Sequence, residues 1–256
     1  MRKKKNSEVK IKDVKYPNIS IGEDQDGNIV EFKGGVLGQT CKVKITRNRH
    51  DYKKGKFIEL LDHSPLENSR HFCSQADICG GCAYQRLPYE TELMLKQDMV
   101  KKLLADNDIF YEGDIPINRS PVIEGFRNKM EYTFGDAYKG GELILGLHRQ
   151  NRFYEIVDTI DCNVVDGDFN TIRNAVQNYF REKNTSFYHK SMKEGLLRHC
   201  IIRKAHRTGE IMAILVTTSD ESFDQMRKKL FVNFLNDLKL DGKIVSIFHV
   251  TNDSVA

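Results

Sequence analysis

The chain has 256 residues, of which 39% are hydrophobic, and its 40 Lys and Arg residues outnumber its 36 Asp and Glu residues, giving a net charge of +4. This composition is typical of a soluble globular protein of one large or two small domains, and it excludes fibrous and disordered classes. No apolar run approaches the roughly 20 residues that a membrane-spanning helix needs. The basic start of the chain leads into polar sequence instead of the apolar part of a signal peptide. We therefore expect a cytoplasmic protein with reduced thiols and no membrane contact.

The positive charge is concentrated in the first quarter of the chain. Residues 1–62 contain 15 Lys and Arg against 9 Asp and Glu, whereas the remainder contains 25 against 27. A basic module attached to a nearly neutral body is the electrostatic pattern expected of a protein that contacts a phosphate backbone. The alternative is a solvated lysine surface with a basic tail.

Short runs of alternating apolar and polar residues fill the stretch 9–61, separated by turn signals. Several short strands within so few residues predict a small closed β-barrel of the oligonucleotide-binding kind over residues 1–62. The alternation places Cys41 in the barrel core and turns Lys42 and Lys44 toward solvent, where they could meet phosphate.

The periodicity is lost from His63 to Gln85, which predicts a cysteine-bearing loop, and a helix is predicted from about Tyr89 to Asn107. Its apolar side is formed by Leu93, Met99, Val100, Leu103 and Leu104. We group the loop and helix as residues 63–110.

Residues 111–256 alternate strands and helices, which predicts a central α/β domain with a mixed sheet and packed helices. The chain as a whole is thus expected to be α+β. A helix with Phe169, Ile172, Val176 and Phe180 inward is capped by Asp166 or Asp168, and a second starts at Ser222 with Phe223, Met226, Leu230 and Phe234 inward. The predicted strands lie near residues 129–134, 143–147, 153–157, 199–204, 211–216 and 244–250.

Three cysteines form a candidate metal site. Cys73, Cys79 and Cys82 are spaced C-x5-C-x2-C, a pattern of thiolates that binds zinc or an iron–sulfur cluster. The two glycines between the last two cysteines would let the backbone pass close to a metal. The fourth ligand is then His71, Cys162, Cys200 or an exogenous group. Free core thiols or disulfides are the alternative.

The string from Cys73 to Gln85, C-x5-C-G-G-C-x2-Q, resembles the signature of the bacterial RNA (uracil-5-)-methyltransferases that modify ribosomal and transfer RNA. The basic barrel is similar to the TRAM domain of that family. Strings elsewhere in the chain that also resemble the family are Arg127–Tyr132, Asp161-Cys162, Gly195–His199 and Arg207–Glu210.

The resemblance implies a 4Fe-4S cluster held by Cys73, Cys79, Cys82 and Cys162, with a structural role. It also implies an S-adenosylmethionine-dependent enzyme that forms 5-methyluridine. In that family the chemistry belongs to a C-terminal Rossmann-like domain, and this sequence contains neither a glycine-rich turn after a strand nor a Pro-Pro-Arg string bearing the nucleophilic cysteine. We therefore expect a fragment or a truncated gene product that holds no catalytic residue. S-adenosylmethionine would bind only the full-length enzyme.

The predicted role of the chain is RNA recognition, as a monomer, with ribosomal RNA favoured over transfer RNA. One alternative is a standalone RNA-binding protein stabilised by a metal. Another is a relative of the radical S-adenosylmethionine methylthiotransferases, although their motif is C-x3-C-x2-C and their barrel is missing here. The candidate RNA-binding residues are Lys42, Lys44, Arg47, Arg49, Lys53, Lys54, Lys56, Arg127, Lys129 and Arg198.

Overall fold

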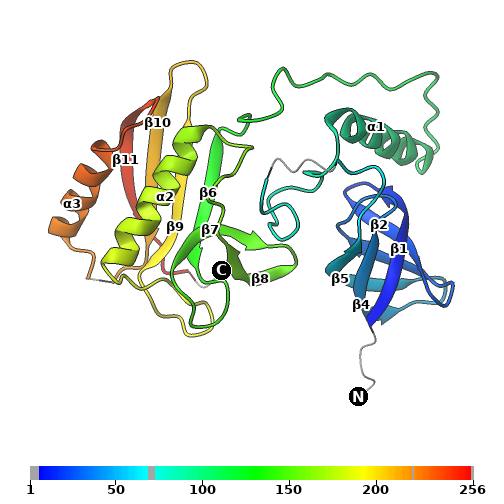
Figure 1. The fold of residues 1–256 in the computed structure, drawn as a ribbon, viewed down its shortest axis with the longest axis horizontal. Helices are drawn as coiled ribbons and strands as arrows, with labels where there is room; N and C mark the ends of the chain where they lie inside the picture. Colours follow the sequence, from blue (N-terminus) through cyan, green and yellow to red (C-terminus); the bar gives the residue numbers. More distant parts are fainter. Residues whose placement is uncertain (1–5, 69–72, 221, 255–256) are drawn as a thin grey trace. The chain divides into compact units, whose positions relative to one another are not determined.

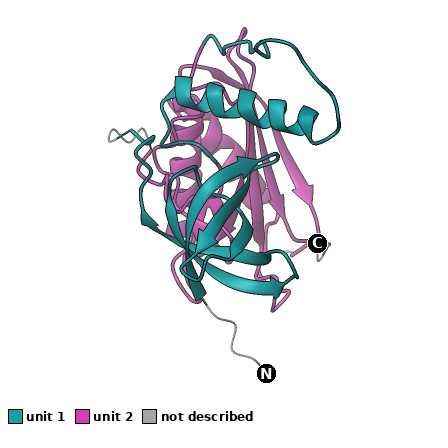
Figure 2. Cartoon of the chain, turned by 90° about the vertical axis from the view of Figure 1, so that its right-hand side faces the viewer, with its two compact units in different colours: residues 1–72, 82–121 teal, residues 73–81, 122–256 magenta. Residues whose placement is uncertain are grey.

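The computed structural model describes residues 6–68, 73–220 and 222–254, and the chain divides into two compact units (Figures 1 and 2). Unit 1 comprises Met1–Phe72 and Cys82–Pro121, and unit 2 comprises Cys73–Gly81 and Val122–Ala256. The segment 73–81 therefore packs with the second half of the chain, although unit 1 residues flank it on both sides. The three-part division expected from the sequence stays a prediction.

Unit 1 contains a closed barrel of five strands in the order β1-β2-β3-β5-β4, which confirms the predicted small barrel. Neighbouring strands are antiparallel except for the parallel pair β3 and β5. The sequence analysis assigned no separate strand to β2. The strands are β1 (Asn6–Lys15), β2 (Ile19–Asp24), β3 (Ile29–Lys33), β4 (Thr40–Asn48) and β5 (Lys53–Asp62).

The barrel core follows from the alternation of residues along each strand. Val9, Val30, Cys41 and Val43 come from three different strands and are all fully buried in one cluster. The predicted inward position of Cys41 is thereby confirmed. Burial raises the pKa of its thiol to about 12, so Cys41 is an uncharged core residue.

Helix α1 (Tyr89–Ala105) packs on the barrel through a narrower face than predicted. Met99 joins the barrel core and Leu93 is buried, but Val100 and Leu103 are exposed. The helix is also tied to β1 by an ion pair between Lys102 and Asp13. The helical period predicts a broad apolar side for this helix, but only part of that side is in contact with the barrel.

Unit 2 is built on a six-stranded sheet in the order β11-β10-β9-β6-β7-β8. Within this sheet, β10 and β11 pair in parallel and the other described pairs are antiparallel, so the predicted mixed sheet is confirmed. The strands are β6 (Lys129–Gly135), β7 (Ile144–Arg149), β8 (Arg152–Val157), β9 (Leu197–Lys204), β10 (Glu210–Thr217) and β11 (Lys243–Thr251).

Helices α2 (Gly167–Glu182) and α3 (Gln225–Asn236) cover one face of this sheet (Figure 1). Phe180 of α2 lies 5.7 Å from the ring of Phe134 on β6 and 5.3 Å from the ring of Phe231 on α3. The four residues predicted to face inward from α2 are all buried, as expected from their helical spacing. Asp166 caps the helix, and its carboxylate accepts a hydrogen bond from the Asp168 N–H at 3.0 Å.

The prediction for α3 was wrong in its start and in part of its buried face, although Phe223 is buried as expected and Phe234 packs on the Tyr179 ring. The helix begins at Gln225, where Asp224 is the N-cap and accepts from the Arg227 N–H at 2.8 Å. Met226 and Leu230, expected inside, are exposed, whereas Phe231 and Leu235 are buried. Phe231 is buried because it packs on the rings of Tyr179 and Phe180 of α2. Across the described parts of the chain, none of the helices has both the length and the apolar character needed to span a membrane.

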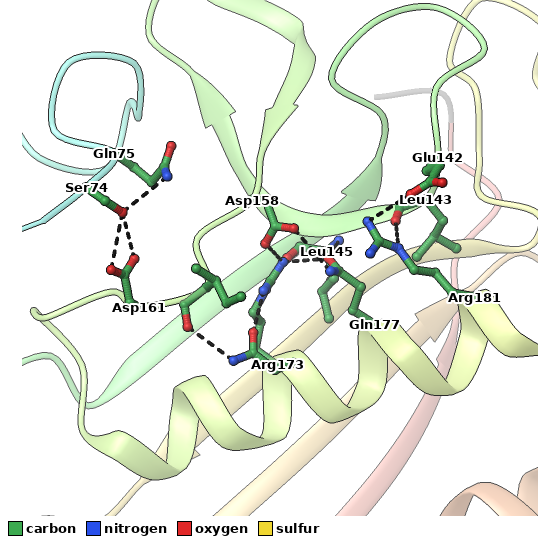
Figure 3. A network of polar contacts seen from close by, with 12 residues as sticks. Ser74, Gln75, Glu142, Leu143, Leu145, Asp158, Asp161, Arg173, Gln177 and Arg181 are labelled. Atoms are coloured by element: carbon green, nitrogen blue, oxygen red, sulfur yellow. Dashed lines mark hydrogen bonds and ion pairs between the residues drawn. The ribbon is translucent and has the colours of Figure 1, made fainter.

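A fully buried arginine joins α2 to the sheet (Figure 3). The Arg173 guanidinium donates to the Leu145 carbonyl, to the Asp158 carboxylate and to Oε1 of Gln177. Gln177 Oε1 also accepts from the Leu145 N–H at 2.7 Å. The network therefore connects one helix, strand β7 and the loop that follows β8.

Candidate nucleic-acid interface and thiol cluster

Four of the predicted RNA-binding residues form a cationic hairpin on the barrel, which we define as Lys44, Arg47, Lys54 and Lys56. The antiparallel register of β4 and β5 sets Lys44 opposite Lys56 and Arg47 opposite Lys54. All four side chains are exposed, and none forms an ion pair with an acidic residue in the described part of the chain. Like charges held side by side repel one another, and a polyanion would relieve that repulsion.

The other predicted cations of the barrel differ in how they are held. Lys42 lies 2.9 Å from a carboxylate oxygen of Glu59 across the same strand pair. Lys53 lies 2.8 Å from the buried carboxylate of Asp24. Burial of Asp24 opposes its ionisation, but the bonds from Lys53 and Asn28 outweigh this and lower its pKa to about 2. Lys53 thus serves barrel structure, whereas the predicted residue Arg49, two positions after Arg47, is exposed.

The predicted cations of unit 2 lie in three different environments. Arg127 is exposed just before β6, and Lys129 is exposed on β6 with Glu131 at 3.5 Å. Arg198 is buried: its guanidinium donates to the carbonyls of Asn252 and Ser254, both at 2.8 Å, and lies over the ring of Tyr188. Because its guanidinium is buried and bonded within the protein, Arg198 is not part of the candidate RNA interface.

The segment that carries the first two cluster cysteines is docked on the β7–β8 hairpin. The Gly80 N–H donates to the His148 carbonyl at 3.0 Å, and the Gln150 N–H donates to the Ile78 carbonyl at 2.8 Å. A Cβ atom on Gly80 would lie 2.9 Å from the His148 carbonyl oxygen, so only glycine fits there. The glycine thus permits a close approach to a strand, whereas the sequence analysis expected it to permit approach to a metal.

Three of the predicted ligands gather in unit 2, and we call Cys73, Cys79 and Cys162 the thiol cluster. Burial raises the pKa of each thiol; neighbouring thiols raise it further for Cys79 and Cys162, and Asp161 does so for Cys73. The Gly81 N–H, 3.4 Å from the sulfur of Cys79, acts in the opposite direction. The Ser74 hydroxyl, which donates to Asp161 at 2.9 Å, ties the two stretches together (Figure 3).

These thiols do not by themselves make a metal site. Within residues 6–68, 73–220 and 222–254, no group of three or more His, Cys, Asp or Glu side chains has an arrangement that could hold a metal ion. Cys82 belongs to unit 1, and His71 lies outside the described residues. Cys200, the other candidate fourth ligand, is buried in β9, where burial raises the pKa of its thiol to about 12.

The sequence analysis missed an exposed aromatic pair, Phe153 and Tyr154 on β8. It placed a strand near these residues and assigned them no role. The available signal was two consecutive aromatic residues close to Arg149 and Arg152, because regular alternation in a strand would bury one of the two rings.

Fold and site together define an α+β protein. It combines a barrel that bears a cationic hairpin with a mixed sheet and a thiol cluster. The chain is 38% identical over 256 residues to an "uncharacterized RNA methyltransferase" of Clostridium tetani, covering all of this chain and 55% of that protein. It is 39% identical to one of Clostridium acetobutylicum with the same coverage. One of Thermotoga maritima is 29% identical, covering 97% of this chain and 54% of that protein.

The chain is therefore homologous to proteins named RNA methyltransferases, in agreement with the broader part of the predicted resemblance. It spans about half the length of these curated relatives. The crystal structure of the Pyrococcus abyssi tRNA (uracil-54, C5)-methyltransferase in complex with S-adenosyl-L-homocysteine has a similar fold, with a TM-score of 0.63 at 20% identity, covering 97% of this chain and 52% of that one. No protein-family model matches the chain.

Proposed function

We propose that this chain is the RNA-recognition part of an S-adenosylmethionine-dependent methyltransferase that forms 5-methyluridine in RNA. The observation that carries the proposal is the alignment of the whole chain with proteins named RNA methyltransferases. The cationic hairpin supplies a surface suited to phosphate. The S-adenosyl-L-homocysteine bound to the structural neighbour, which is what S-adenosylmethionine becomes after methyl donation, supports the choice of donor.

The thiols of the chain favour a recognition role over a catalytic one. Attack on a uracil ring carbon requires a thiolate, which is the nucleophilic form of cysteine. Cys41 and Cys200 are buried with pKa values raised to about 12, so each is overwhelmingly protonated near neutral pH. Neither is therefore assigned a catalytic role, as the sequence analysis also concluded.

The proposal names RNA as the substrate class without a preference for ribosomal RNA. The expected preference has no support from the comparisons, since the similar solved structure is of a tRNA methyltransferase. Neither a standalone binding protein nor a radical S-adenosylmethionine enzyme is favoured by a specific contact in the structure.

RNA binding by this chain is expected to weaken steeply with salt. Each cation that neutralises a phosphate adds about 0.7 to the slope of log affinity against log salt for single strands. With the four cations of the cationic hairpin engaged, affinity should fall about fiftyfold between 50 and 200 mM salt. Fluorescence anisotropy with a labelled uridine-containing RNA measures this. Affinity that is independent of salt, or absent at low salt, would reject the proposal.

We also propose that Cys73, Cys79, Cys82 and Cys162 hold a 4Fe-4S cluster with a structural role. The support is the sequence spacing together with the proximity of the three thiols in unit 2. The described residues as they stand offer no formed metal-binding group, so the cluster would have to organise its own ligands. Such a centre would join segment 73–81 to the stretch around residue 162.

Anaerobically purified protein should show a broad absorption band at about 400 nm and should contain about four iron atoms per chain. Cys162→Ser should remove most of both signals because it deletes a ligand. Cys200→Ser, which changes a buried thiol outside the thiol cluster, is the matched control and should keep them. Colourless wild-type protein, or equal iron in the two variants, would refute the cluster assignment.

A further inference from the structure

The end of the β7–β8 hairpin presents two neighbouring aromatic rings to solvent. Phe153 is 53% exposed and Tyr154 is 74% exposed. The strand pairing shifts register here, with His148 opposite Ile156 but Arg149 opposite Arg152, so residues 153–155 bulge out of the ladder. The bulge explains why two consecutive side chains are both exposed, which a regular strand would not allow.

The two rings are braced by their neighbours. Phe153 stacks on His148 with ring centroids 4.7 Å apart and planes 8° apart, and Lys190 Nζ lies 4.2 Å from the centroid of the same ring. Tyr154 meets Phe153 edge to face, with centroids 5.7 Å apart. Phe153 is thus occupied by its contacts, and Tyr154 is the ring that is left open to a ligand.

The surroundings of the pair are cationic. Arg149, Arg152 and Lys190 lie around it, and Glu155 is the carboxylate that pairs with the two arginines, at 3.4 and 2.7 Å. Both arginines are engaged by Glu155, and Lys190 places a further positive charge directly against the Phe153 ring, beside exposed Tyr154. Basic side chains interleaved with open aromatic rings are the recurring features of surfaces that bind single-stranded nucleic acid.

The β7–β8 hairpin is also held by residues 78–80. Residues 78–80 add a short bridge to its end, through the Gly80 and Gln150 amide bonds and the pairing of Cys79 with Arg149. These contacts hold the end of β7 and the turn that leads into β8, the strand at the edge of the sheet (Figure 1). A ring fixed in this way loses little freedom when a planar ligand stacks on it.

We propose that Tyr154, braced by Phe153, is a stacking platform for an unpaired RNA base, with Lys190 placed to neutralise an adjoining phosphate. The inference rests on the proposed RNA-binding function and adds a second contact region, in unit 2, to the cationic hairpin of unit 1. It also specifies the form of the RNA, because a base inside a duplex does not offer its face to a side chain.

Tyr154→Ala should lower affinity for a single-stranded oligoribonucleotide about tenfold to a hundredfold. The slope of affinity against salt should stay unchanged, because no charge is removed. Tyr154→Trp should retain affinity, since it keeps a ring. Tyr138→Ala is the matched control, because Tyr138 is an exposed tyrosine of the same unit at 70% exposure. A 2-aminopurine base in the RNA should be quenched by wild type and Tyr154→Trp but not by Tyr154→Ala.

The outcomes separate this inference from the function on which it rests. Wild-type binding that weakens with salt, together with equal affinities of Tyr154→Ala and Tyr138→Ala, would overturn the platform and leave the proposed function standing. An equal loss for a blunt RNA duplex would also overturn it, because the contact would then be to backbone. A wild-type chain that binds no RNA would reject both proposals. Circular dichroism of each variant excludes misfolding as the cause.

Discussion

Arg173→Met should lower the free energy of unfolding by about 2–4 kcal/mol, the largest loss that we expect from a single substitution. The guanidinium is fully buried. Its removal leaves the Leu145 carbonyl oxygen without this donor and deprives Gln177 Oε1 of one of its donors. The Asp158 carboxylate is partly exposed, so water compensates for part of its loss. Urea unfolding followed by circular dichroism measures the change as a lower midpoint.

Two further variants identify the cause of that loss. Arg173→Lys keeps the charge but not the planar fork of donors, so it should fall between wild type and Arg173→Met. Arg207→Met removes an exposed arginine of the same unit and should change stability by less than about 0.5 kcal/mol. If Arg173→Met unfolds at the wild-type midpoint, the network does not stabilise unit 2.

Changing all four residues of the cationic hairpin to glutamine should reduce RNA affinity at about 100 mM salt between tenfold and several hundredfold. The salt slope should fall by about 3, since four phosphate contacts are lost at about 0.7 each. The fold should survive because these side chains are exposed and bear no ion pair with a described acidic residue. Anisotropy titrations at several salt concentrations measure both quantities.

The control removes the same charge from a different surface. Four exposed cations of unit 2, changed together to glutamine, give the same net charge as the hairpin variant. If binding depends on the cationic hairpin, this control should keep most of the RNA affinity. If the two variants lose affinity equally, only net charge matters and the cationic hairpin is not the interface. The four residues are Lys139, Arg207, Lys229 and Lys239.

The boundary between prediction and structure is clear for the cations of the barrel. Period-two alternation correctly turned Lys44 outward, but it treated Lys42 and Lys53 in the same way. Their partners lie on other strands: Glu59 meets Lys42 when β4 pairs with β5, and Asp24 of β2 meets Lys53 only when the barrel sheet assembles. A local pattern reports which face a side chain takes, and it carries no information about a partner distant in the chain.

The same limit applies to the thiols. Spacing singled out Cys73 and Cys79, and resemblance added Cys162, but the docking of segment 73–81 on β7 appears only in the structure. Gly80 is needed for that docking, a role that its sequence context did not reveal.

The sequence by itself determined the small barrel, the inward position of Cys41, the buried stripe of α2 and the concentration of positive charge, since each depends on composition or on a short period along the chain. Only the tertiary structure decided that Arg198 is buried, that α1 uses a narrower face than expected and α3 a partly different one, and that Arg173 joins a helix to the sheet. These features depend on which surfaces meet. That is set by packing and hydrogen bonding between segments far apart in sequence, which no local pattern encodes.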